Sequence, residues 1–168
     1  AGMFPNHDTL TMSEQDWEKV MHTNLTGTYY ITREAVKVMR EKGRGGSIIF
    51  TSSESAYRPG PSYAHYNASK GAVDALMRSF AVEDAADGIR ANSIAPGLVM
   101  TEGNRKSKEQ LTEALGVTDA WEAIGSTIPL GRLGFPDDIA RTALFCASDL
   151  SIYITGHLFD CDGGSILK

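Results

Sequence analysis

The sequence has few cysteines, no long apolar run and no excess of basic residues, and each of these absences excludes a class of protein. Its 168 residues include two cysteines, Cys146 and Cys161, which are too few for a disulfide framework and suit a reducing compartment. We therefore expect a cytoplasmic protein. No run of 18 apolar residues occurs and no basic start leads into an apolar stretch, so neither a membrane span nor a signal peptide is expected. The net charge of -5 argues against nucleic acid as a partner.

The composition and periodicity that are present belong to an ordinary globular chain. With 42% hydrophobic and 22% charged residues, disorder, collagen and coiled coil are excluded, and the length predicts one domain. Apolar residues at helical spacing predict helices, and short β-branched or apolar runs predict buried strands. The helices are expected at 14–41, 63–86 and 136–147, and the strands at 47–51, 89–95 and 157–161.

Two segments interrupt this regular pattern. Gly27 lies in a threonine-rich stretch, so the first helix is expected to kink or to form two pieces. Residues 98–128 are polar and irregular, with weak helix signals at 107–115 and 118–124, which is typical of a lid or binding loop. Strands that alternate with helices predict an α/β fold with a parallel sheet. Three strands are fewer than the roughly five of an average sheet, so strands are expected to be missing from the front.

Tyr66 and Lys70 are the sharpest chemical feature, because they stand four residues apart on a predicted helix and share one face. A tyrosine has an intrinsic pKa of about 10, and lowering it by about three units takes about 4 kcal/mol. A lysine ammonium about 4 Å away supplies about that much at an effective dielectric near 20. The pair therefore suits a tyrosine general acid/base tuned by lysine. The alternative is an exposed tyrosine that packs on a lysine stem.

Ser53 adds context to this pair. It stands thirteen residues before Tyr66, just past the first predicted strand, and ligands of open α/β sheets bind outside the carboxyl ends of strands. Its hydroxyl could donate a hydrogen bond to a carbonyl oxygen. Ser52 is the rival, but alternation along the strand puts the two serines on opposite sides, and the spacing to Tyr66 favours Ser53.

At these residues the sequence resembles the short-chain dehydrogenase/reductase family. The stretch from Gly46 to Ser53 is similar to its strand-then-serine motif, and Tyr66-x3-Lys70 matches its active-site pair at the usual separation. Asn24-Leu25-Thr26-Gly27 resembles the helix motif that holds a catalytic asparagine. The likeness continues in order through the Pro-Gly turn at Pro96-Gly97, Thr101, Gly131 to Gly134, Pro136 to Ala140 and Asp162-Gly163-Gly164.

The resemblance implies an NAD(P)-dependent oxidoreductase that interconverts a carbonyl and an alcohol by hydride transfer. It makes Ser53 the group that polarises the carbonyl and Tyr66 the proton donor or acceptor. Lys70 then lowers the Tyr66 pKa, and Asn24 holds a water that links Lys70 to solvent. NAD or NADP is expected to contact Ala1, Gly2, Tyr66, Lys70, Pro96, Gly97, Val99 and Thr101. A small-molecule carbonyl or alcohol is expected to contact Ser53, Ser55, Tyr57 and Tyr66. The four histidines have no metal-ligand spacing, so no metal is expected.

The resemblance also implies how the chain is organised. Residues 1–168 correspond to the C-terminal two-thirds of one NAD(P)-binding, Rossmann-like, doubly wound domain with a substrate lid at about 98–128. Ala1-Gly2 is similar to the end of the family's Asn-Asn-Ala-Gly motif. The N-terminal βαβαβ portion, which selects NAD or NADP, is therefore expected to be missing, and the 168-residue piece is expected to be inactive alone. In the family the helices matching 14–41 and 63–86 form a subunit interface, which implies a homo-oligomer.

Three alternatives stay open. The chain could be a non-catalytic binding or assembly subunit of the same fold, although the intact Ser53, Tyr66, Lys70 and Asn24 argue against this. It could be an epimerase or dehydratase of a sister branch, which usually carries an added C-terminal domain. Tyr63-x6-Lys70 also fits the spacing of the family's enoyl-reductase branch, but the matching serine favours Tyr66.

Overall fold

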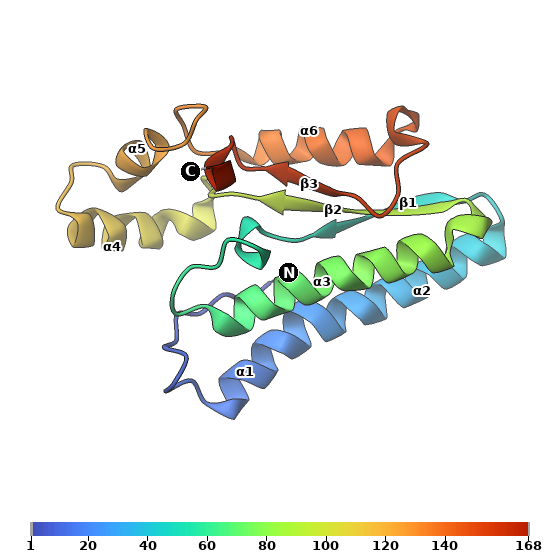
Figure 1. The fold of residues 1–168 in the computed structure, drawn as a ribbon, viewed down its shortest axis with the longest axis horizontal. Helices are drawn as coiled ribbons and strands as arrows, with labels where there is room; N and C mark the ends of the chain where they lie inside the picture. The colour runs from blue at the N-terminus through green and yellow to red at the C-terminus, as the bar shows by residue number, and fades with distance from the viewer. Residues whose placement is uncertain (1, 168) are drawn as a thin grey trace.

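The computed structural model describes residues 2–167, and for residues 104–107 it describes the backbone only. Helices and strands alternate along the chain in the predicted order (Figure 1). The helices are α1 Glu14–Met21, α2 Gly27–Lys42, α3 Ala64–Glu83, α4 Arg105–Leu115, α5 Ala120–Gly125 and α6 Pro136–Ala147. The strands are β1 Gly46–Thr51, β2 Ile89–Pro96 and β3 Leu158–Cys161.

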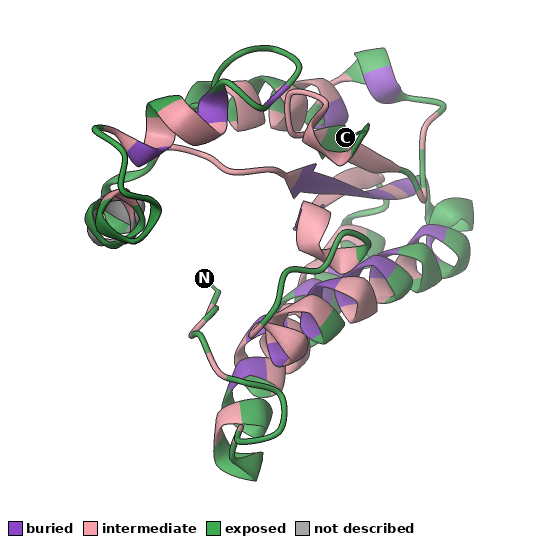
Figure 2. Ribbon diagram, turned by 60° about the vertical axis from the view of Figure 1, so that its left-hand side comes forward, coloured by how far each residue is buried: buried purple, intermediate pink, exposed green. Residues whose placement is uncertain are grey.

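The three strands form one parallel sheet in the order β1-β2-β3. Phe50 on β1 lies opposite Ser93 on β2, and Ala95 on β2 lies opposite Asp160 on β3. The middle strand, β2, is the most buried (Figure 2), as expected for a strand that is covered on both faces and paired on both edges. The predicted α/β fold with a parallel sheet is confirmed.

Helices cover both faces of this sheet, which makes the arrangement doubly wound. Figure 1 shows α2 and α3 along one face and α6 along the other, with α4 and α5 beyond the carboxyl ends of the strands. Val73, Met77 and Ala81 recur one turn apart on α3 and pack against Phe50 and other side chains of the sheet. The carboxyl ends of the strands are thereby left facing α4 and α5. Among the described helices, none has the length and apolar character to cross a membrane.

The long first helix is broken where the sequence predicts a kink. Ser13 caps α1 by accepting a hydrogen bond from the Asp16 backbone N–H at 3.1 Å. A π-helical turn, η1 (His22–Thr26), then joins α1 to α2. Gly43 ends α2 with a φ of 60°, in the left-handed region that favours glycine. Turns of the π type often carry functional residues, and this one holds Asn24.

Glycine permits the close approach of β1 and β2 at their amino ends. Gly45 has a φ of +67°, and a Cβ there would lie 2.5 Å from the carbonyl oxygen of Gly88. The backbone N–H of Gly46 donates to the same oxygen at 3.1 Å. The sheet register at this end therefore depends on a residue without a side chain.

Candidate active site

The carboxyl ends of β1 and β2 place the candidate residues beside one another. Ser53 follows β1 by two residues and begins a short 3₁₀ turn, Glu54–Ala56, whose Ser55 backbone N–H donates to the Ser53 Oγ at 3.2 Å. Tyr66 and Lys70 occupy the first two turns of α3, and Pro96 ends β2. Because neighbouring parallel strands end at the same edge, the loops after them and the start of α3 converge there.

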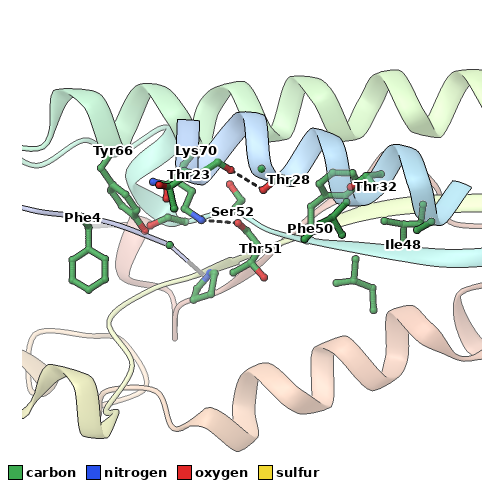
Figure 3. Close-up of a pocket in the computed structure, with 18 of the residues that line it drawn as sticks. Phe4, Thr23, Thr28, Thr32, Ile48, Phe50, Thr51, Ser52, Tyr66 and Lys70 are labelled. Atoms are coloured by element: carbon green, nitrogen blue, oxygen red, sulfur yellow. Dashed lines mark hydrogen bonds between the residues drawn. The ribbon is translucent and has the colours of Figure 1, made fainter. Parts of the chain in front are cut away.

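Lys70 is held by the end of the first strand. Its ammonium Nζ donates a hydrogen bond to the Thr51 carbonyl oxygen at 2.8 Å, and the side chain is buried (Figure 3). Burial lowers the pKa of Lys70, because an ammonium loses its hydration, while the nearby Asp74 carboxylate raises it. The hydrogen bond to Thr51 therefore holds the lysine in place, and the pKa of its ammonium depends on burial and on the buried Asp74 carboxylate.

Tyr66 and Ser53 both line the two cavities of the site, and the Ser53 hydroxyl acts on the tyrosine. Burial raises the pKa of Tyr66 above its ordinary value, the Ser53 hydroxyl lowers it, and the Glu54 carboxylate raises it again. Lys70 Nζ lies 5.7 Å from the centre of the Tyr66 ring, while its hydrogen bond goes to a backbone carbonyl. The structure thus brings Ser53, Tyr66 and Lys70 together, and the lowering of the Tyr66 pKa by lysine stays a prediction.

Asn24 is buried on η1 and fastens the N-terminal segment to α3. Its Oδ1 accepts from the Met3 backbone N–H at 2.8 Å, and its Nδ2 donates to the Met3 carbonyl at 2.9 Å and to Ser69 Oγ at 3.0 Å. Both amide hydrogens are therefore used within the protein. A water held by Asn24 would have to bond an oxygen of this residue, so the predicted water relay stays a prediction.

Two cavities meet at Tyr66. The inner cavity, about 570 Å³, lies between α2 and β1 and reaches Asn24 and Lys70. The second cavity, about 840 Å³, lies between Glu54, the segment 98–128 and α6, and we call it the lid cavity because a lid is expected at 98–128. Both are lined by the same central set, which is Phe4, Thr51, Ser53, Tyr66, Pro96 and Gly97. A ligand in either cavity would therefore touch the tyrosine.

The remaining predicted contacts divide between these cavities. Gly2 lines the inner cavity, whereas Ser55, Val99 and Thr101 line the lid cavity. Ala1 falls outside the described residues. Tyr57 is not among the lining residues of either cavity, and its hydroxyl hydrogen-bonds the Asp160 carboxylate on β3. Burial, and then that contact, raise the pKa of Tyr57.

Sequence reasoning did not assign α6 to the site, although its spacing contained a signal. Pro136, Ile139, Ala140 and Ala143 recur at the spacing of one helix face and line the lid cavity. Such a pattern predicts that this face of the helix is buried, but it does not predict which residues or cavity the face contacts. Leu111 on α4 and Trp121 on α5 supply the opposite wall. The segment 98–128 thus contributes helices as well as loop to this cavity.

Together the sheet and the site define a ligand-binding α/β fold. A half-buried tyrosine lies between a serine and a lysine at the carboxyl edge of a doubly wound parallel sheet, which is the edge where open α/β sheets bind their ligands. A family model described as enoyl-(acyl carrier protein) reductase matches residues 1–165. The chain belongs to the short-chain dehydrogenase/reductase family, as the sequence motifs predict.

Several relatives agree with this assignment. The chain is 39% identical to an L-rhamnose 1-dehydrogenase (NAD(P)(+)) of Azotobacter vinelandii, over 98% of this chain and 61% of that protein. It is 36% identical to a 3-oxoacyl-[acyl-carrier-protein] reductase FabG of Thermotoga maritima, over 99% of this chain and 64% of that protein.

A solved structure gives the same result. It is a putative 2-deoxy-d-gluconate 3-dehydrogenase from Agrobacterium tumefaciens with bound NADP, which matches with a TM-score of 0.89 and 33% identity. The match covers 100% of this chain and 65% of that one. The chain thus spans less than two-thirds of the length of these proteins.

Proposed function

We propose that this chain carries the proton-transfer and substrate-binding part of an NAD(P)-dependent oxidoreductase that interconverts a carbonyl and an alcohol. The observation that carries the proposal is the position of Tyr66, which lies at the junction of two cavities and within reach of Ser53 and Lys70. A proton donor at such a junction can serve a substrate in one cavity while a second ligand occupies the other.

The end of the inner cavity beside Tyr66 and Lys70 suits the nicotinamide nucleoside. Its walls offer the Lys70 ammonium and the Tyr66 hydroxyl, which are partners for ribose hydroxyls, beside the small residues Gly2 and Gly97. Val99 and Thr101 lie on the lid-cavity side, where they could meet the carboxamide of the ring. When bound, the nicotinamide supplies or accepts the hydride, and the protein supplies position and charge.

The residues of this chain would then bind the substrate oxygen and exchange a proton with it. In reduction Ser53 donates a hydrogen bond to the carbonyl oxygen, and Tyr66 transfers its phenolic proton to that oxygen as the alcohol forms. The tyrosine is left as phenolate, which the positive charge of Lys70, 5.7 Å from the centre of the ring, stabilises. Solvent then returns the proton to Tyr66. Oxidation runs through the same groups in reverse.

The open edge of the sheet supports the proposal that residues 1–168 are part of a larger domain. Among the described strands none pairs with the outer edge of β1, whose Ile48 and Ile49 line the inner cavity together with Ile31 of α2. We propose that an N-terminal βαβαβ portion completes this face and supplies the phosphate-binding turn. The relatives are longer by about the length of such a portion.

The substrate is proposed as a small or medium carbonyl or alcohol. The lid cavity has an apolar wall from Leu111, Trp121 and Ile139, and polar groups gather at Ser53, Ser55 and Glu54. Such a cavity fits a molecule with an apolar body and one oxygenated end. The named relatives act on different molecules, one a sugar and one an acyl chain, and they do not choose between these for this chain.

The test is turnover in the complete protein. NAD(P)H absorbance is followed against a panel of carbonyl compounds, with Tyr66→Phe and Tyr63→Phe as matched variants, since both tyrosines line the lid cavity. We expect Tyr66→Phe to lower kcat by about 10³-fold and Tyr63→Phe to leave kcat within a few-fold. Absence of any nicotinamide binding, or unchanged turnover in Tyr66→Phe, overturns the proposal. Loss of activity in Tyr63→Phe alone would favour the enoyl-reductase alternative.

Assembly and location form a second part of the proposal. Tyr30 and Val38 of α2 and Val82 of α3 are exposed apolar side chains, with Val82 80% accessible. A homo-oligomer that buries these helix faces accounts for them. A monomeric mass of the complete protein in light scattering would contradict it. The two cysteines are unpaired, which supports a reducing, cytoplasmic location.

A further inference from the structure

Behind Lys70, α3 carries a third polar residue at the same spacing. Tyr66, Lys70 and Asp74 stand at positions i, i+4 and i+8, so they lie along one face of the helix. Asp74 is only 4% exposed, and the carboxylate is therefore almost fully buried. A buried carboxylate is costly unless it has partners or a charge to balance.

The partners of Asp74 come from the end of β1. Ser52 Oγ donates a hydrogen bond to Asp74 Oδ2 at 2.8 Å, and the Ser52 backbone N–H is tied to the Ile94 carbonyl at 2.8 Å. The other carboxylate oxygen, Oδ1, is buried without a hydrogen-bond partner among the described residues. One hydrogen bond alone does not balance a buried negative charge, and a nearby cation would do so.

Lys70 is that cation. It lies one helical turn before Asp74, and Asp74 is the charged group that acts on it, raising its pKa against the effect of burial. The other groups that Lys70 Nζ contacts are neutral, namely the Thr51 carbonyl and the Tyr66 ring. The Glu54 carboxylate acts on Tyr66.

We propose that Asp74 is a positioning residue, oriented by Ser52, that keeps the buried Lys70 ammonium charged and directed toward the Thr51 carbonyl beside Tyr66. For its catalytic meaning this inference rests on the proposed function. Asp74 touches neither cavity and acts only through Lys70, because it is absent from the lining of both. The consequence is that Lys70 stays protonated over the pH range in which Tyr66 works.

The test is a titration of Lys70 that requires no turnover. The protein is labelled with ¹³C-lysine, and the Lys70 signal is assigned by its loss in Lys70→Arg. Asp74→Asn keeps the size and can still accept from Ser52, but it removes the charge. We expect the midpoint of the Lys70 titration to fall by about one pH unit or more in Asp74→Asn. An unchanged midpoint overturns the inference.

A matched variant separates charge from hydrogen bonding. Ser52→Ala removes the hydrogen bond and keeps the carboxylate, so the Lys70 midpoint should fall much less than in Asp74→Asn. Equal falls in both variants would overturn a role based on charge. If Asp74→Asn does not give the spectrum of a folded protein, Asp74→Ser takes its place, since it is also uncharged and smaller. Because the signal is that of a lysine, a protein without turnover still gives a result, and failure of the proposed function is detected separately.

Discussion

Asn24→Ala should destabilise the protein by about 3 kcal/mol. The side chain makes three hydrogen bonds while 2% exposed, two of them to the backbone of Met3. Alanine would leave the Met3 N–H and carbonyl without these partners, and each buried polar group without a partner costs about 1–3 kcal/mol. The lower half of that range applies, because Met3 is half-buried and water can reach part of it. The N-terminal segment should also detach from α3.

Urea unfolding and hydrogen exchange measure the two effects separately. The exchange of the Met3 amide should quicken by far more than that of the core amides of β2, since the segment is released locally. Asn67→Ala is the control, because the Asn67 side chain makes a single exposed hydrogen bond, to the Gly60 carbonyl at 3.2 Å. It should change stability by about 0.5 kcal/mol or less. A loss of the same small size in Asn24→Ala, with unchanged Met3 exchange, would refute the reasoning.

Two further predictions concern the site and the sheet. Glu54→Gln should lower the pKa of Tyr66, because the Glu54 carboxylate raises it, so the Tyr66 phenolate should form at lower pH. The measurement is ultraviolet absorbance of the phenolate, taken as a difference from Tyr66→Phe in each background, and an equal or higher midpoint contradicts it. Gly45→Ala should cost about 2 kcal/mol or more in urea unfolding, since its Cβ would meet the Gly88 carbonyl and its φ is positive. Gly60→Ala, with open space around it, is the control and should stay within about 0.5 kcal/mol.

The regular elements could be predicted because their signals are local. The strand and helix patterns at 47–51, 89–95 and 136–147 agree with β1, β2 and α6 to within one residue at each end. The helix predicted to reach residue 86 ends at Glu83 instead. Its successor Asp84 is buried and paired with Arg40 of α2, a contact between distant parts of the chain. The weak helix signals at 107–115 and 118–124 agree with α4 and α5 to within two residues at each end. The pairing order of the strands depends on contacts between distant parts of the chain and was less visible.

The residues of the candidate site also differ in whether a local sequence signal or a distant contact defines them. Tyr66 and Lys70 could be found because their chemistry and their shared helix face lie within one turn of sequence. The next residue on that face, Asp74, looks like an ordinary surface acid in a sequence, since aspartate is rarely buried. Its burial follows only when the end of β1 brings Ser52 against the third turn of α3. Alternation along the strand predicts that Ser52 and Ser53 point to opposite sides, but it does not predict what each contacts. In the proposed reaction Ser53 binds the substrate oxygen, whereas Ser52 orients the Asp74 carboxylate.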